Sequence, residues 1–95
     1  MSAVYSISPD VAWVEAADGG KEEPSVWISH LQSGTQYELT DTAWLMWVLL
    51  AEQPRTAVEL LEALRTEGGD QVEIRESEVE SFLGRLHTQC LLVNP

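Results

Sequence analysis

The sequence predicts an α+β fold in which a small three-stranded antiparallel sheet is followed by three helices. The first half of the chain consists of short segments rich in β-branched and aromatic residues, separated by turn-forming residues. The second half has its apolar residues at helical spacing and contains two helix-start signatures. A chain of 95 residues suffices for one modest hydrophobic core, so we interpret residues 1–95 as a single domain.

The strands of the predicted sheet precede residue 40. Residues 11–16 and 26–31 are rich in strand formers, and residues 4–7 are a candidate for a further short strand. A turn at 32–34 reverses the chain into residues 35–39, TQYEL, in which polar and apolar residues alternate. This alternation is typical of a strand with one buried face, and we expect residues 35–39 to be the third strand of the sheet.

The first predicted helix follows this strand directly. Thr40 or Asp41 is placed to cap it, and nine consecutive apolar residues, 43–51, indicate a helix that is buried on every face. Its two tryptophans are therefore assigned to the core, and Pro54 ends the helix.

Two capping boxes predict the starts of the remaining helices. Thr56 with Glu59 opens the second helix, which ends at residues 68–69, and Ser77 with Glu80 opens the third. Strands followed by three helices, with a short loop between the last two, predict a winged helix-turn-helix arrangement. The apolar stripe of the third helix consists of Val79, Phe82, Leu83, Leu86 and Cys90.

The charge balance argues against the DNA-binding role of many winged helices. Sixteen acidic residues against five basic ones give a net charge of -11, which opposes binding to phosphate backbones and to anionic membranes. The third helix and the residues that lead into it carry four glutamates, where a recognition helix needs basic side chains. We therefore expect no nucleic-acid or membrane partner, and a partner that is neutral or basic at least in part.

Cysteine usage and the N-terminus predict the cellular compartment. The sole cysteine, Cys90, excludes an internal disulfide, which fits a reducing environment. The N-terminal residues lack a signal-peptide pattern, and the longest apolar run, 43–51, is too short to cross a bilayer. We expect a cytoplasmic protein.

The sequence contains no recognisable catalytic constellation. His87 and Cys90 lie three positions apart, but two ligands do not make a zinc site, and His30 is the only other histidine. The same pair lacks an orienting third group for nucleophilic catalysis, and neither Gly-Gly pair has the context of a phosphate loop. We expect a binding module that is not an enzyme and has no catalytic residues, metal or cofactor.

Four motifs carry a family resemblance. They are Tyr5-x-Ile7-Ser8-Pro9-x-Val11, the segment 26–50 with Gly34 in its hairpin and Trp47 in its helix, Arg55-Thr56-x-x-Glu59-Leu60, and the segment 79–93. With these motifs the chain resembles the PqqD-like proteins, the recognition elements for precursors of ribosomally synthesised and modified peptides. Its length and its Tyr-x-x-Ser-Pro opening most resemble the stand-alone leader-binding proteins of lasso peptide clusters. Thr40 and Cys90 depart from the family, which often has Asn and Gly at these positions.

The resemblance implies that a leader peptide pairs antiparallel with strand 35–39 and lies in the cleft between that strand and the third helix. An edge strand exposes unpaired backbone groups, and this one is poorly guarded, because it has no proline and a single charge, Glu38. Two questions stay open: whether the N-terminus or the tail 90–95 covers this edge, and whether Arg75 and Arg85 are solvated or pair with acidic leader residues. The implied peptide-binding residues are Thr35, Gln36, Tyr37, Glu38, Val79, Phe82, Leu83 and Leu86.

The resemblance further implies two partner enzymes, a cysteine peptidase that removes the leader and an ATP-dependent cyclase that closes the ring. Three rival interpretations remain: a recognition protein for another modified-peptide pathway such as pyrroloquinoline quinone synthesis, a winged-helix transcription factor, and a structural adaptor without a peptide cleft. The charge balance disfavours the transcription factor. Neighbouring genes for a cyclase and a small precursor would separate the lasso pathway from the first rival.

Overall fold

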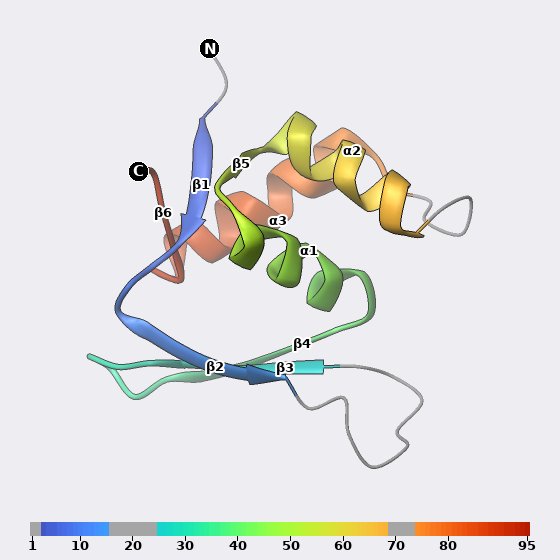
Figure 1. Ribbon diagram of the computed structural model, residues 1–95. Coiled ribbons are helices and arrows are strands. Elements are labelled where there is room, and N and C mark those ends of the chain that lie inside the picture. Colours follow the sequence, from blue (N-terminus) through green and yellow to red (C-terminus); the bar gives the residue numbers. More distant parts are fainter. Residues whose placement is uncertain (1–2, 16–24, 69–73) are drawn as a thin grey trace.

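The computed structural model describes residues 3–15, 25–68 and 74–95. Within these residues three helices lie on one side of a three-stranded sheet, and a second small sheet joins the two ends of the chain (Figure 1). The predicted α+β class, with a three-stranded antiparallel sheet ahead of three helices, is confirmed. The elements in chain order are β1 (Val4–Ile7), β2 (Val11–Glu15), β3 (Ser25–His30), β4 (Gln36–Thr40), α1 (Asp41–Glu52), β5 (Arg55–Thr56), α2 (Ala57–Gly68), α3 (Glu76–Thr88) and β6 (Leu92–Val93).

Strands β2, β3 and β4 form an antiparallel meander with β3 at its centre. Their side chains alternate between two faces of the sheet, as the pleat requires. The inner face carries the buried Val26 and Ile28 and the partly buried Tyr37 and Leu39, all of which belong to the hydrophobic core. The outer face carries Trp27, whose residue surface is 44% exposed. The helices therefore cover one face of this sheet.

A second antiparallel sheet has the order β5-β1-β6. The candidate strand at residues 4–7 is confirmed as β1, whereas its pairing into a second sheet was not predicted from the sequence. β1 pairs with β5 on one side and with β6, at Ile7 and Leu92, on the other. The side-chain amide of Asn94 donates to the Val4 carbonyl over 2.8 Å. Because β5 and β6 contain two residues each, no local periodicity reveals them. The sheet places the first and the last described strands side by side (Figure 1).

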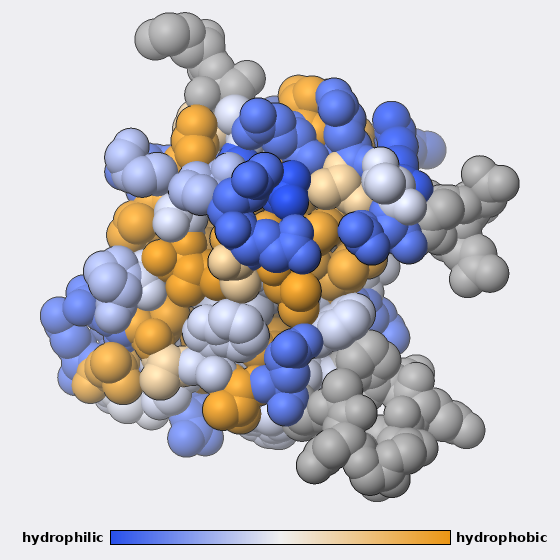
Figure 2. Space-filling view, in the orientation of Figure 1, coloured by the Kyte–Doolittle hydropathy of each residue, from blue (hydrophilic) through white to orange (hydrophobic). Residues whose placement is uncertain are grey.

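The core lies between the inner face of the β2-β3-β4 sheet and the helices. Trp47 of α1 is fully buried, and Trp13 of β2 packs against it edge to face, with 6.0 Å between ring centres. Trp44 lies at the margin of the core, where its indole N–H donates to Glu15 Oε1 over 3.0 Å. Apolar side chains reach the surface between the helices and the sheet, with hydrophilic side chains around them (Figure 2). The prediction of two core tryptophans in α1 is therefore confirmed for Trp47, whereas Trp44 is only partly buried.

One of the two predicted capping boxes is confirmed. The Thr56 N–H donates to Glu59 Oε1 over 2.8 Å, and the Glu59 N–H donates to Thr56 Oγ1 over 3.1 Å. The second box is wrong, because α3 begins one residue before Ser77, with Arg75 as its N-cap and no side-chain capping bond. The N–H groups of residues 78 and 79 donate to the Arg75 carbonyl, so Ser77 lies inside the first turn.

The start of α1 also lacks a side-chain cap. Thr40 is the N-cap residue and has extended backbone angles, but its side chain makes no capping hydrogen bond. Asp41 follows with φ of 55°, in the left-handed region that residues other than glycine seldom adopt. The predicted cap at the start of this helix is therefore not formed.

The end of α3 turns through a left-handed residue, Cys90, with φ of 64°. The Cys90 N–H donates to the His87 carbonyl and the Leu91 N–H to the Leu86 carbonyl, each over 3.0 Å. These two bonds form a Schellman motif, in which the left-handed position favours glycine. The cysteine is exposed, so its predicted place in the apolar stripe of the helix is wrong, whereas the other four members of the stripe are buried.

Candidate functional site

The outer edge of β4 has no strand partner among the described residues. β4 pairs with β3 on one side and is the last strand of its sheet. The described parts of the N-terminus and the tail do not pair with it, because β1 and β6 pair with each other. The edge runs over residues 36–40, without a proline and with Glu38 as its single charge. An edge of this length and composition can accept a further strand.

The hairpin between β3 and β4 determines where the backbone groups of β4 point. The His30 N–H donates to the Thr35 carbonyl over 2.9 Å, so these opposite residues form a hydrogen-bonded pair. In an antiparallel ladder such pairs alternate with pairs that are not hydrogen-bonded to each other. Two and four positions further along, Tyr37 and Leu39 therefore direct their N–H and C=O groups toward β3.

The other residues of β4 direct their backbone groups toward the free edge. They are Gln36, Glu38 and Thr40. Gln36 and Glu38 each offer one donor and one acceptor, whereas Thr40 offers its N–H, because its carbonyl, as the N-cap of α1, accepts the first hydrogen bond of that helix. The pairing of β3 with β2, on its other side, agrees with this alternation. The Leu31 N–H donates to the Asp10 carbonyl over 2.9 Å, so the odd-numbered residues of β3 bond to β2 and the even-numbered ones bond to β4. An incoming strand can therefore bond to β4 without disturbing the β3-β4 ladder.

A cleft of about 340 Å³ lies between this edge and α3, and we call it the β4-α3 cleft. Residues 37–40 form one wall, and four α3 residues form the other, namely Phe82, Arg85, Leu86 and Gln89. Phe82 and Leu86 are one helical turn apart, so they lie on the same face of the helix. The cleft thus combines an apolar helix face with a strand edge that is rich in free backbone groups.

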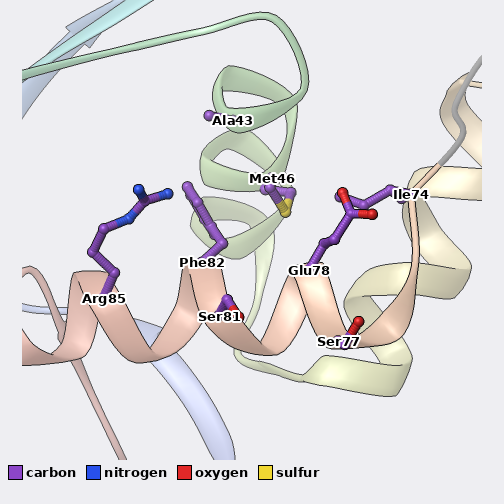
Figure 3. A pocket seen from close by; sticks show the side chains of 8 residues that line it. All are labelled: Ala43, Met46, Ile74, Ser77, Glu78, Ser81, Phe82 and Arg85. Atoms are coloured by element: carbon purple, nitrogen blue, oxygen red, sulfur yellow. The ribbon is translucent and has the colours of Figure 1, made fainter.

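A second cavity, of about 530 Å³, continues along α3 toward the start of that helix. It lies between α1 and α3, and Met46, Ile74 and Glu78 are among its lining residues. Figure 3 shows Arg85, Phe82 and Glu78 projecting from the same side of α3 toward α1. We call this second space the α1-α3 cavity and the two together the α3 groove. The residues that line both are Ala43, Phe82 and Arg85.

Four of the eight residues that the sequence proposed for peptide binding line the β4-α3 cleft. They are Tyr37, Glu38, Phe82 and Leu86. Val79 and Leu83 lie in the core instead, with 0% of their surface exposed, and do not line either cavity of the groove. The apolar stripe of a helix is one continuous pattern in the sequence, so its period does not separate residues that fill the core from residues that border a groove.

Thr35 and Gln36 lie outside the cleft. Thr35 is exposed in the hairpin, where its N–H donates to Ser33 Oγ over 3.2 Å. Gln36 borders a hollow of about 310 Å³ on the outer face of the sheet, next to Trp27 and Val14. Its backbone still belongs to the free edge of β4, where it directs its N–H and C=O groups outward.

Several lining residues were missed by the sequence reasoning. Gln89 completes the spacing i, i+3, i+4, i+7 that begins at Phe82, and Leu39 continues the alternation of the strand, so a signal for both was present. Met46 and Ile74 had no such signal, because the α1-α3 cavity depends on how two helices cross. Sequence periodicity therefore indicates one cavity of the groove and not the other.

The α3 groove carries charges of both signs. Arg85 lies where the two cavities meet, and Glu78 lies in the α1-α3 cavity. Arg85 is exposed, and its side chain makes neither a hydrogen bond nor an ion pair with the described residues, whereas Arg55 pairs with Glu52 at 3.2 Å outside the groove. The guanidinium of Arg85 is thus available to a ligand.

The described part of the chain offers no arrangement for metal chemistry. Its histidine, cysteine and carboxylate side chains form no group of three that could hold a metal ion. None of the described helices combines the length and the apolar character that crossing a bilayer requires.

The family model for coenzyme PQQ synthesis protein D (PqqD) matches residues 26–92. This chain belongs to the PqqD family. The matched range contains β4, α1 and α3 and therefore both cavities of the α3 groove. The family resemblance inferred from the motifs is confirmed.

A solved structure extends the likeness beyond the range of the PqqD match. "TbiB1 in Complex with the TbiA(beta) Leader Peptide" superposes with a TM-score of 0.73 and 26% sequence identity, over 95% of this chain and 96% of that chain. A comparison with curated protein sequences found no match. This member of the PqqD family thus shares its fold with a protein that was solved with a leader peptide.

Proposed function

We propose that this chain binds the leader region of a ribosomally synthesised precursor peptide, as a strand added antiparallel to β4. The observation that supports this proposal most is the free β4 edge beside an apolar face of α3. Membership of the PqqD family and the likeness to TbiB1, which was solved with a leader peptide, support the same class of ligand. The pathway that we propose is lasso peptide biosynthesis.

Strand addition divides the peptide side chains between the two faces of the sheet. Peptide residues opposite Tyr37 and Leu39 point to the inner face, toward Phe82 and Leu86, so they should be apolar. Peptide residues opposite Glu38 point to the outer face and are less restricted. Main-chain bonds then supply affinity, and the alternate side chains that enter the cleft supply specificity.

The expected affinity is the balance of favourable and unfavourable contributions to the free energy of binding. Each main-chain hydrogen bond contributes about 0.5–1.5 kcal/mol net, and burial of apolar leader side chains adds to this. A leader that is disordered until it binds loses part of this free energy to ordering. The result is a dissociation constant of roughly micromolar to nanomolar order.

The protein supplies no catalysis in this proposal. It holds the leader in the cytoplasm while a separate cysteine peptidase removes it and an ATP-dependent cyclase closes the ring. Tethering raises the effective concentration of the substrate for those enzymes, which no longer have to find it by diffusion at each step. Strand addition leaves the core region of the precursor outside the groove, where another active site can reach it.

Isothermal titration calorimetry with three synthetic peptides tests the proposal. The full precursor and its isolated leader should bind with dissociation constants within about twofold of each other, and the leaderless core should not bind. A scrambled leader of the same composition is the control for nonspecific attraction by the acidic surface. Equal binding of leader and core, or no binding of either, would contradict leader recognition.

The name of the family supports a second candidate, recognition of a precursor in another modified-peptide pathway such as pyrroloquinoline quinone synthesis. The groove and the mode of binding are the same in this alternative, and only the peptide differs. Titration of a lasso leader and a pyrroloquinoline quinone precursor against the same protein separates the two. The tighter ligand, by at least about tenfold, identifies the pathway.

A further inference from the structure

We propose that the α3 groove selects the order of charges in its peptide, with Arg85 binding a peptide carboxylate and Glu78 binding a basic residue on its N-terminal side. The inference rests on the proposed function, because it concerns the peptide that β4 binds. It adds a second segment to that ligand: the residues that precede the strand-paired part continue along α3 into the α1-α3 cavity.

The continuity of the groove is the first argument. The β4-α3 cleft and the α1-α3 cavity share Ala43, Phe82 and Arg85, so a chain that fills one reaches the other without leaving the protein surface. A peptide antiparallel to β4 has its N-terminal side at Thr40, and Thr40 and Ala43 line the cleft together. The occupant of the α1-α3 cavity is therefore the N-terminal continuation of the same peptide.

The apolar part of the lining of the α1-α3 cavity is the second argument; Ser77, Ser81 and the two charged residues form the rest of that lining. Met46 and Phe82 are each 4% exposed, and Ile74 is partly buried beside them. The volume of about 530 Å³ falls in the range of small-ligand sites. A large apolar peptide side chain fits this chemistry, and it would anchor the continuation between the two charges.

The spacing of the charges is the third argument. Glu78 and Arg85 project from the same side of α3 (Figure 3), and they are separated by seven positions in the sequence. In a helix this separation is about two turns, or roughly 10 Å along the axis. An extended peptide advances about 3.3 Å per residue, so its basic residue should precede its acidic residue by about three positions.

The charge of the whole chain makes this contact selective. A net charge of -11 repels acidic peptide residues in general, and Arg85 is the one basic side chain among the described residues that line the groove. An acidic residue is therefore favoured at one register and disfavoured at the others. Exposed charge pairs of this kind change affinity modestly, so their effect is on register more than on total binding.

A charge-reversal cycle tests the inference. Arg85→Glu should weaken binding of the native leader by roughly threefold to tenfold, and a leader with one acidic residue replaced by Lys should restore it. Glu78→Arg should likewise be rescued by a basic-to-Glu change about three positions earlier in the peptide. Arg75→Glu is the matched control, because Arg75 is exposed next to α3 and lines neither cavity, and it should leave affinity unchanged.

The outcomes separate this inference from the proposed function. A leader that fails to bind the wild-type protein contradicts both. Two outcomes overturn the charge-order inference alone, provided that the leader binds the wild-type protein normally. In the first, Arg85→Glu changes leader affinity no more than Arg75→Glu does; in the second, no single charge reversal in the peptide restores the affinity lost in Arg85→Glu. Should the reversal at position 85 disturb folding, as judged by circular dichroism, Arg85→Gln replaces it. Arg85→Gln should show a smaller loss, and replacing the paired acidic peptide residue by Gln should then cause no further loss; a further loss as large as in the wild-type protein overturns the inference.

Discussion

The two antiparallel sheets formed by the described residues have the same number of strands, but they differ in whether their edges can pair with a further strand. In the β5-β1-β6 sheet both edge strands contain two residues; β5 leads directly into α2, and Asn94, just after β6, binds back to Val4. In the β2-β3-β4 sheet the edge strand β4 contains five residues and borders the β4-α3 cleft. The first sheet joins the two ends of the chain, and the second can be extended by a further strand at β4.

The difference shows that strand length and surroundings determine which edge can take a ligand. A two-residue edge offers too few outward groups to hold a peptide, which is one way in which proteins keep sheet edges from pairing. The β4 edge offers three outward N–H groups, at residues 36, 38 and 40, and two outward carbonyls, at residues 36 and 38, and an apolar helix face lies opposite. Substitutions in the two sheets should therefore have separable effects, on binding in one and on stability in the other.

The largest expected effect is on binding, from Glu38→Pro. Proline removes the outward N–H of residue 38, and its ring occupies the position of the incoming strand, while the β3-β4 ladder keeps its bonds. The lost bond and the steric conflict should together weaken leader binding by about tenfold or more, measured by calorimetry.

Two matched variants show whether the loss of binding comes from the outward N–H of residue 38, from its side chain or from damage to the sheet. Glu38→Ala keeps the N–H and should bind the leader within about threefold of wild type, because the exposed side chain contributes little. Tyr37→Pro removes an N–H that points to β3 and should lower the free energy of unfolding by at least about 1–3 kcal/mol. Equal losses of leader affinity in Glu38→Pro and Glu38→Ala would show that the side chain, and not the strand edge, holds the peptide.

A smaller effect, on stability alone, is expected from Asn94→Ala in the closed sheet. This variant removes the hydrogen bond to the Val4 carbonyl and should lower the free energy of unfolding by about 0.5–1.5 kcal/mol in urea denaturation. Leader affinity should stay within about twofold of wild type, because the β5-β1-β6 sheet lies outside the groove. A large loss of affinity in a folded Asn94→Ala protein would contradict the separation of the two sheets.

The smallest effect is a gain in stability from Cys90→Gly. The left-handed backbone at residue 90 strains a residue with a Cβ, and glycine relieves that strain at the cost of a more flexible unfolded chain. The net change should be an increase of about 0.5–1 kcal/mol in the free energy of unfolding. Cys90→Ala keeps the Cβ and removes the thiol, so it should show no such gain; an equal gain in both variants would assign the effect to the thiol instead.

The sequence predicted the parts of the fold that depend on neighbours in the chain. The alternation over residues 35–39, the apolar run of α1 and the Thr56-Glu59 capping box all have local signals, and the structure contains each of them. The β5-β1-β6 sheet has no such signal, because it pairs two-residue strands with a segment from the other end of the chain. The Ser77-Glu80 pattern matched a capping box by composition, but the helix had already begun when the chain reached Ser77.

The candidate site was predictable at β4 and only in part at α3. Helical period identifies the apolar face that holds Phe82 and Leu86, but Val79 and Leu83 belong to the same face by this criterion. Only the packing of the fold shows that those two residues lie in the core and not in the groove. The α1-α3 cavity and the position of Arg85 within the groove depend on the crossing of α1 and α3. Such geometry follows from tertiary packing, which a pattern within one helix does not contain.

Amide hydrogen exchange at single residues, measured by NMR with and without the leader, tests the central claim most directly. Without peptide, the N–H groups of Gln36, Glu38 and Thr40 should exchange fast, while those of Tyr37 and Leu39 are already protected by β3. Saturating leader should slow exchange at residues 36, 38 and 40, giving continuous protection along β4. Unchanged exchange at these three residues, in a complex whose formation calorimetry has established, would contradict strand addition at this edge.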